Sequence, residues 1–187
     1  MPNVSTCQAE NSALVVVDIQ QRLGDAMPGK VLNRVLLNTT LLARTSDLME
    51  IPVLQTEQYP QGLGATHAAV AEAVPATTRV FEKQSFSCCG ADGFTQAIDA
   101  SGRRQFVLVG MEAHVCVLQT ALDLQRRGFD AFVVEDAICS RRLENYQNAL
   151  DRLRQNGVHV VSAESVVFEW MGSATHPHFK AIQALLR

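Results

Sequence analysis

The sequence predicts a single α/β domain in which helices cover both faces of a parallel β-sheet. Short apolar runs alternate with longer helical patterns along the 187 residues, as expected for strands joined by crossover helices. Several of the apolar runs are continuous rather than alternating, which is typical of strands buried on both faces. No internal repeat, low-complexity tract or linker divides the chain, so we expect one domain over residues 1–187.

Six strands are expected, with helices between them. The strands are predicted over residues 13–18, 51–57, 78–83, 104–110, 129–136 and 158–163. The segment 115–127 carries apolar residues at helical spacing and ends in two arginines before Gly128, which suits the negative end of a helix. The segment 141–157 places leucine and tyrosine side chains on one face and ends at Gly157, a common stop residue.

Composition argues against several classes of protein. Hydrophobic residues make up 47% of the chain, and 16 Lys+Arg against 19 Asp+Glu give a net charge of −3, which does not suit a dedicated nucleic-acid binder. No apolar stretch approaches the ~20 residues of a membrane helix, and the first residues do not resemble a secretory signal. The five cysteines show no metal-site spacing and are interpreted as free thiols, so we expect a cytoplasmic protein.

Three reactive side chains are expected at one edge of the sheet. Asp18 ends the first strand, Lys83 ends the third, and Cys116 stands where the fourth strand is followed by a helix. The carboxyl ends of parallel strands share one edge, where open α/β sheets bind ligands. Each residue alone has an ordinary explanation, as a turn aspartate, a surface lysine or a small buried cysteine. Their coincidence at one edge favours a catalytic site.

The three groups have complementary chemistry. A helix N-terminus and a nearby cation are expected to lower the pKa of the Cys116 thiol from about 8.5 towards neutrality, which favours the nucleophilic thiolate. Asp18 can accept the thiol proton and later assist water. Lys83 can keep that carboxylate ionised and help to hold the thiolate. Backbone N–H groups of the turn 111–116 can donate to an oxyanion.

The motifs around these residues resemble those of a known superfamily. "LVVVDIQ" around Asp18, "RVFEKQSFS" around Lys83 and "LVGMEAHVCVLQTALD" around Cys116 are similar to the isochorismatase-like cysteine hydrolases. This superfamily includes nicotinamidases, carbamoylsarcosine amidases and ureidoacrylate amidohydrolases. The resemblance covers the whole chain and implies a six-stranded sheet of order 3-2-1-4-5-6. The motif spacing and the tail "HPHFKAIQALL" resemble the small isochorismatase-domain hydrolases.

The resemblance also implies roles for individual residues. Cys116 is then the nucleophile, Asp18 the general base and Lys83 the third member of a catalytic triad. The superfamily has a non-proline cis peptide bond before its nucleophile, and this position corresponds to Met111–Glu112. The resemblance implies that this bond directs the N–H groups of Glu112 and Cys116 into one oxyanion hole.

The chain departs from the nicotinamidase pattern at the metal site. Nicotinamidases carry an Asp-x-His motif and a further histidine after the second strand, whereas this chain offers only Glu57 and the distant His67. A divalent metal needs several converging ligands, so we expect no metal and no cofactor, and nicotinamide is not the expected substrate. The cysteine favours acyl chemistry on an amide or a related carbonyl. Candidate substrate-binding residues, each with local packing as the alternative, are Gln20, Glu57, Tyr59 and Phe86.

Two further features are less specific. Cys88 and Cys89 are adjacent, and adjacent cysteines rarely form a disulfide, so we expect them in a loop near the site. His114 occupies a position where the superfamily commonly has an acidic residue, and a variation of the helix cap explains it equally well.

Three functions stay open on the sequence. The first is a cysteine hydrolase of a small molecule that acts through an acyl-thioester intermediate. The second is a vestigial or non-enzymatic protein on the same fold that forms oligomers or binds a partner, against which the intact triad argues. The third is a ribonuclease, a label that some relatives bear, although the negative charge does not support it. The apolar segments 166–172 and 179–186 predict a homo-oligomer, and no membrane or nucleic-acid partner is expected.

Overall fold

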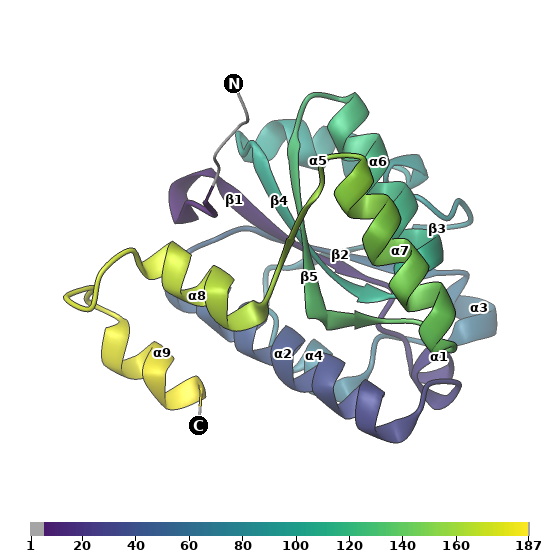
Figure 1. Ribbon diagram of the computed structural model, residues 1–187, viewed down its shortest axis with the longest axis horizontal. Coiled ribbons are helices and arrows are strands. Elements are labelled where there is room, and N and C mark those ends of the chain that lie inside the picture. Colours follow the sequence, from purple (N-terminus) through teal and green to yellow (C-terminus); the bar gives the residue numbers. More distant parts are fainter. Residues whose placement is uncertain (1–5, 187) are drawn as a thin grey trace.

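The chain folds as a six-stranded parallel sheet with helices on both faces (Figure 1). The computed structural model describes residues 6–186. The strands are β1 (Ser12–Val17), β2 (Val53–Gln58), β3 (Arg79–Lys83), β4 (Gln105–Met111), β5 (Asp130–Cys139) and β6 (His159–Val161). Each neighbouring pair is parallel, and the strand order is β3-β2-β1-β4-β5-β6. The predicted fold class and the strand order that the resemblance implied are therefore confirmed.

The helices form a layer on each side of the sheet (Figure 1). One layer contains α2 (Gly29–Leu48), α4 (Ala68–Ala71), α8 (Ala163–Met171) and α9 (Phe179–Leu185), and the other contains α5 (Phe94–Ser101), α6 (Leu118–Arg126) and α7 (Leu143–Gln155). Shorter elements are η1 (Ala9–Asn11), α1 (Gln21–Asp25), α3 (Pro60–Leu63), η2 (Cys88–Gly90) and the π-helical turn η3 (Ala113–Val117). Within residues 6–186, no helix has the length and apolar character to cross a membrane.

Strand β1 shows why the predicted strands lack an alternating pattern. All six of its residues are buried. Leu14 and Val16 pack into the core under α2 and α8, and Val15 and Val17 pack into the core under α5 and α6. Full burial of one such side chain stabilises the fold by roughly 1.5–3 kcal/mol. Apolar residues are therefore favoured on both faces of the strand, as its continuous apolar run indicated.

Strand β5 extends three residues beyond the predicted end at residue 136, to Cys139, because it contains a bulge. Leu108 of β4 pairs with Val133, but Gly110 pairs with Ile138. The partner moves five residues along β5 while β4 advances by two, so β5 carries three additional residues over this stretch. Beyond the bulge, Cys139 pairs with Met111, the last residue of β4, so the two strands end side by side at the carboxyl edge of the sheet.

Side chains from both helical layers satisfy the main chain of the bulge. The Tyr146 hydroxyl of α7 donates to the Glu135 carbonyl at 2.8 Å, and the Asn38 amide of α2 donates to the Asp136 carbonyl at 2.8 Å. Buried carbonyl groups require such partners where the ladder of the sheet is interrupted. These side-chain hydrogen bonds therefore stabilise the bulge.

Gly110 allows β4 to approach β1 closely. Its φ of +121° is rarely adopted by residues with a side chain, and a Cβ at this position would overlap the carbonyl group of Val17. Beyond this approach, β1 continues into Asp18 and β4 continues into the turn that bears Cys116. The order of the strands reverses between β1 and β4, and open α/β sheets bind ligands at such a point.

Candidate active site

The three reactive side chains predicted from the sequence meet at the carboxyl edge of the sheet. The Nζ atom of Lys83 lies 2.7 Å from Oδ2 of Asp18 and 3.6 Å from Sγ of Cys116. The side chains of Asp18 and Lys83 are 0% exposed, and Cys116 is 6% exposed. Asp18 and Cys116 follow adjacent strands, and Lys83 reaches them from β3, two strands away from β1. The arrangement joins a carboxylate, an ammonium group and a thiol in a buried position.

The backbone of Asp18 ends β1 sharply. Its φ is 48°, in the left-handed region that aspartate adopts more readily than most residues. Its N–H group donates to the carbonyl of Thr56 in β2 at 3.2 Å. This turn ends the strand and leaves the carboxylate next to Lys83 at the edge.

The Lys83 ammonium group is surrounded by acceptors. Besides Asp18, it lies 2.6 Å from Oε1 of Gln58 and 3.2 Å and 3.1 Å from the carbonyl oxygens of Ser85 and Phe86. An ammonium group has three hydrogens, so these acceptors share them. Each acceptor stabilises the charged form of the lysine. Sequence reasoning missed Gln58, which reads as an ordinary residue at the end of a strand.

Two pKa shifts describe the electrostatics of the site. Burial opposes the charge on Lys83, but the neighbouring Asp18 carboxylate and then the thiols of Cys88 and Cys116 raise its pKa above the ordinary value. Burial raises the pKa of the Cys116 thiol to about 12, and Asp18 adds to this effect while Lys83 opposes it. The expectation of a lowered thiol pKa is therefore wrong for the resting site. Burial and the carboxylate together outweigh the cation.

The turn before Cys116 has the backbone that the resemblance implied. The peptide bond between Met111 and Glu112 is cis. The π-helical turn from Ala113 to Val117 follows it and carries Cys116, and α6 continues from Leu118. The helix expected from residue 115 therefore begins as a wider turn, which positions the nucleophile candidate before the regular helix starts.

The segment after β5 and the first turn of α7 hold this turn in place. The Glu112 carboxylate accepts the N–H of Arg141 at 2.9 Å and its Nε–H at 3.1 Å. On the other side of the turn, Nδ1 of His114 lies 2.9 Å from the Ser140 hydroxyl, and Nε2 lies 3.3 Å from Nδ2 of Asn145. Sequence reasoning did not find these partners, because they lie 26–31 residues away along the chain and carry no recognisable motif.

Two of the four predicted substrate-binding residues hold a loop. The buried Gln20 amide accepts from the N–H of Gln58 at 2.8 Å and donates to the carbonyl of Gly64 at 2.6 Å. Oε1 of Glu57 accepts from the N–H and the hydroxyl of Thr66, at 2.7 and 2.8 Å. These side chains fasten the segment that follows β2.

The other two predicted residues have free surface. Tyr59 is 49% exposed and Phe86 is 54% exposed. The Phe86 carbonyl contacts the Lys83 ammonium group, so its aromatic ring stands on the segment that lines the lysine. Apolar rings with free surface next to a polar centre are suited to contact with a small ligand.

The residues considered as remnants of a metal site are used otherwise. Nδ1 of His67 accepts from the N–H of Ala69 at the start of α4, and Glu57 is held by Thr66. Within the described residues 6–186, no group of three or more His, Cys, Asp or Glu side chains is arranged to hold a metal ion.

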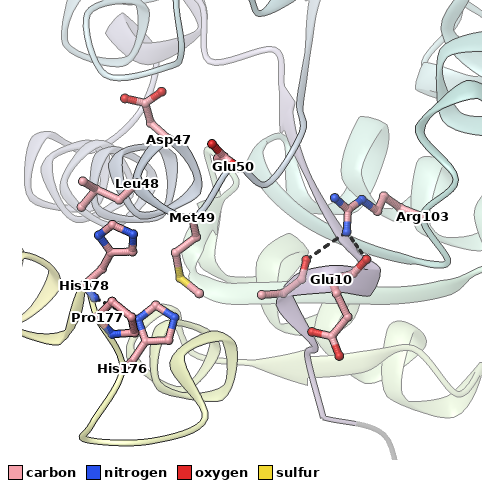
Figure 2. Close-up of a pocket in the computed structure, with 10 residues that line it drawn as sticks. Glu10, Asp47, Leu48, Met49, Glu50, Arg103, His176, Pro177 and His178 are labelled. Carbon is pink, nitrogen blue, oxygen red and sulfur yellow. Dashed lines mark hydrogen bonds between the residues drawn. The ribbon is translucent and has the colours of Figure 1, made fainter.

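A separate cleft of about 810 Å³ lies at the opposite, amino edge of the sheet (Figure 2). Its polar lining residues include Glu10, Asp47, Glu50, Arg103, His176 and His178. Arg103 donates to the main-chain carbonyls of Ala9 and Glu10, and Figure 2 shows Arg103 and Glu10 across the cleft from His176 and His178. The cleft contains none of the three residues of the buried site.

The fold and the site together define an α/β protein with reactive groups at the switch point of its sheet. Residues 12–165 match the isochorismatase domain. The chain belongs to the isochorismatase family of hydrolases.

Named relatives cover nearly the whole chain. Isochorismatase domain-containing protein 2 of Bos taurus is 36% identical over 178 residues, which span 95% of this chain and 83% of the relative. The secreted isochorismatase effector Isc1 of Phytophthora sojae is 34% identical over 183 residues, with 95% and 85% of the two chains covered.

Solved structures share the fold. The MAR1 ribonuclease of Caenorhabditis elegans superposes with a TM-score of 0.92 and 33% identity, covering 97% of this chain and 92% of that one. The YcaC gene product of Escherichia coli, described as an octameric hydrolase of unknown specificity, superposes with a TM-score of 0.84 and 23% identity, covering 100% and 96%. At this lower identity, the second likeness concerns the fold alone.

Proposed function

We propose that the protein is a cysteine hydrolase that cleaves a small amide or a related carbonyl compound through an acyl-thioester intermediate. The contact of the Lys83 ammonium group with both Asp18, at 2.7 Å, and Cys116, at 3.6 Å, carries the proposal. A buried nucleophile next to a base and a cation is the arrangement that covalent acyl transfer needs.

In the first half of the reaction, the sulfur becomes acylated. Asp18 accepts the proton of the Cys116 thiol, and the sulfur forms a bond to the carbonyl carbon of the substrate. The carbonyl electron pair moves to oxygen, where the N–H groups of Glu112 and Cys116 donate to the oxyanion. The electron pair then returns, the C–N bond breaks, and the amine leaves with the proton from Asp18.

In the second half, water removes the acyl group. Asp18 accepts a proton from water, the water oxygen attacks the thioester carbon, and the C–S bond breaks as the acid forms. The proton returns to the sulfur. Lys83 stays charged throughout, because its pKa is raised above the ordinary value by Asp18 and the neighbouring thiols, although burial opposes this. It stabilises the carboxylate and the transient thiolate.

The high pKa of the Cys116 thiol fits this mechanism. Burial and Asp18 raise that pKa to about 12, so the resting sulfur is protonated at neutral pH. Attack therefore requires proton transfer to a base in contact with it. Asp18 is the base that the site offers, which makes its carboxylate as necessary as the sulfur.

The substrate is proposed to lie against the aromatic rings of Tyr59 and Phe86. Both side chains are about half exposed, and the main chain of each contacts Lys83: the Tyr59 N–H donates to the Lys83 carbonyl, and the Phe86 carbonyl accepts from the Lys83 ammonium group. Gln20 and Glu57 are proposed to shape the pocket indirectly, since their side chains are engaged by the loop after β2. No step uses a metal ion or an organic cofactor.

Ribonuclease activity is a second candidate, because the MAR1 ribonuclease of Caenorhabditis elegans is 33% identical with a TM-score of 0.92. Of the five histidines, His114 lies in the turn that carries the nucleophile. The others lie at the start of α4 (His67), in β6 (His159) and in the amino-edge cleft (His176 and His178). Cleavage of RNA by the purified protein that is lost in Cys116→Ala would support this candidate over amide hydrolysis.

We propose a homo-oligomer on a partly different basis from the sequence. Trp170, Met171 and Ile182 of the C-terminal segments are buried within the chain, whereas Phe168 of α8 is 43% exposed. Leu37 of α2 and Leu143 of α7 are 67% and 63% exposed, and the YcaC relative is described as octameric. Light scattering at micromolar concentration tests this, and a monomeric mass would contradict it.

A cytoplasmic location is also proposed, because all five cysteines are free, which suits a reducing compartment. The relative from Phytophthora sojae is named a secreted effector. Fractionation of the source cells tests the location, and recovery outside the cells would overturn it.

The central experiment screens purified protein against small amides, ureas and nicotinamide, with Cys116→Ala as the control. A substrate should yield an acyl adduct on the peptide that contains Cys116, which mass spectrometry after rapid acid quenching detects. Turnover that persists in Cys116→Ala would show that the sulfur is not the nucleophile.

A further inference from the structure

A buried threonine hydroxyl lies between the Asp18 carboxylate and a second thiol. Oγ1 of Thr56, in β2, is 2.8 Å from Oδ1 of Asp18 and 3.5 Å from Sγ of Cys88. Asp18, Thr56 and Cys88 are all 0% exposed. None of these contacts follows from the triad, and the reaction described above does not use Cys88.

The hydrogen bonds through Thr56 run in one direction. An ionised carboxylate only accepts hydrogen bonds, so the single hydroxyl hydrogen of Thr56 goes to Asp18. The contact with Cys88 must then use the thiol hydrogen as donor and the threonine oxygen as acceptor. Burial and then Asp18 raise the pKa of the Cys88 thiol to about 12, so this hydrogen is present at neutral pH. The chain runs from Cys88 through Thr56 to Asp18.

This chain divides the two oxygens of the carboxylate. Oδ1 accepts from Thr56, while Oδ2 lies 2.7 Å from the Lys83 ammonium group that also contacts Cys116. Rotation of the carboxylate would break both contacts at once. The hydrogen bond from Thr56 therefore holds Oδ1 of Asp18. Oδ2 is left facing Lys83, whose ammonium group also contacts Cys116.

A second threonine closes the arrangement into a ring. Oγ1 of Thr120, in α6, accepts from the N–H of Cys88 at 2.9 Å and donates to the carbonyl of Cys116 at 2.7 Å. Thr120 is buried as well. The segment that bears Cys88 is thus fastened to the residue that bears the nucleophile, so the position of the donor thiol is tied to the position of the sulfur.

We propose that Thr56 is a positioning residue of this site and that the Cys88 thiol is the donor that orients its hydroxyl. The inference rests on the proposed role of Asp18 as the base for Cys116. The hydroxyl stabilises the ionised form of Asp18 and so sets the acidic limb of the pH dependence of Cys116 reactivity. The titratable groups that face Asp18 are Lys83 from β3, Cys116 from η3 and Cys88 from η2.

The test measures the rate of Cys116 alkylation by iodoacetamide between about pH 2.5 and 9, a range that includes the ordinary protonation of an aspartate at about 3.9, read from the mass of its peptide. In Thr56→Val, the acidic limb should move up by about one pH unit, because one charge-assisted hydrogen bond to the carboxylate is lost. Thr56→Ser restores the hydroxyl and should return the limb to the wild-type position. Thr39→Val is the matched control, since Thr39 is equally buried but lies in α2, away from the site.

Two variants of Cys88 test whether its thiol acts as a hydrogen-bond donor to Thr56 or only fills space. Cys88→Ser keeps a donor and should retain the wild-type limb, whereas Cys88→Ala should shift it in the same direction as Thr56→Val by a smaller amount. The proposal is overturned if the acidic limb of the alkylation rate lies at the same pH in wild type and in folded Thr56→Val. It is also overturned if Thr56→Ser does not return the limb to the wild-type pH. If Thr56→Val does not fold, the Cys88 pair decides, and equal limbs in those two variants overturn the proposal.

The outcome also separates this inference from the proposed function. Wild-type Cys116 that reacts with an acidic limb, together with a Thr56→Val limb that does not move, leaves the function standing and removes the role of Thr56. Wild-type Cys116 that does not react at any pH while Cys89 does removes both.

Discussion

The two edges of the sheet differ in whether their charged side chains are buried and paired. At the carboxyl edge, Asp18 and Lys83 are fully buried and contact a thiol. At the amino edge, a cleft of about 810 Å³ is lined by carboxylates, histidines and Arg103, but the contacts of that arginine go to main-chain carbonyls (Figure 2). The open cleft at the amino edge therefore lacks the buried ion pair that distinguishes the carboxyl edge. We therefore base the proposed site on buried, mutually dependent groups and not on open volume.

The difference has an energetic basis. A charge that is taken out of water is tolerated only when a partner and hydrogen bonds replace the lost hydration. Asp18 has such partners in Lys83 and Thr56. Charges at an open edge keep their hydration, so substitutions there have small consequences.

The largest expected difference between the edges is in activity. Cys116→Ala should lower turnover of a confirmed substrate by about 10⁴-fold or more, because the nucleophile is lost. Asp18→Asn should lower it by about 10²–10⁴-fold, because proton transfer is lost. His178→Ala, in the amino-edge cleft, should leave kcat/KM within a factor of two or so of wild type. A large loss of activity in His178→Ala with retained activity in Cys116→Ala would move the site to the other edge.

A smaller difference is expected in stability. Lys83→Met leaves the Asp18 carboxylate buried without its cation and should lower the free energy of unfolding by roughly 3–5 kcal/mol. Arg103→Met removes hydrogen bonds at the amino edge and should cost about 1 kcal/mol. Urea unfolding at pH 7 measures both, and similar losses in the two variants would show that the buried pair has no special cost.

Alkaline pH should weaken the fold progressively. Burial raises the pKa of the Cys88, Cys116 and Cys139 thiols from 9.0 to about 12. Above pH 9 the unfolded chain loses thiol protons that the folded chain keeps, so stability falls as pH rises, by about 1.4 kcal/mol per pH unit for each thiol. Lys83 acts in the same direction. Its raised pKa, set against burial mainly by Asp18, gives stability that is present below the unfolded value of 10.5 and is lost above it.

Urea unfolding at pH 8, 9.5 and 10.5 measures this slope. Cys7, near the amino edge, also has a raised pKa because of burial and Glu169, so a comparison of variants assigns the effect. Cys139→Ala should reduce the slope of unfolding free energy against pH by the contribution of one thiol, about 1.4 kcal/mol per pH unit. A slope that is unchanged in Cys139→Ala would show that this thiol ionises alike in the folded and unfolded chains.

The smallest effect is expected at the bulge of β5. Tyr146→Phe removes the donor to the Glu135 carbonyl and should lower the free energy of unfolding by about 0.5–1.5 kcal/mol. Thermal unfolding compared with wild type detects a loss of this size. An unchanged melting temperature would mean that water replaces the hydroxyl at that carbonyl.

The sequence carried enough information to predict the fold and to bring Asp18, Lys83 and Cys116 to one edge. Continuous apolar runs, a reactive residue after each of three strands, and motifs that resemble a known family all pointed to the same architecture. These signals are local along the chain, and the rule that parallel strands share one carboxyl edge converts them into proximity.

The supporting contacts could not be predicted in the same way. Thr56 reads as a β-branched residue that favours a strand, and its contact with Asp18 depends on the register of β1 and β2. The direction of the Cys116 pKa shift was also missed. A sequence shows a cation and a helix start, but it does not show how far the sulfur is removed from water.

The bulge in β5 interrupts the pairing with β4 only locally, because Ile138 and Cys139 pair again with Gly110 and Met111. Side chains of Asn38 and Tyr146, rather than a neighbouring strand, satisfy its carbonyl groups. The segment 140–142 therefore leaves the sheet beside the turn at 112–116, to which Ser140 and Arg141 are hydrogen-bonded. A change in the length of that segment is expected to move these contacts together with the turn. The segment after β5 thus acts as a mechanical support for the residue that bears the sulfur.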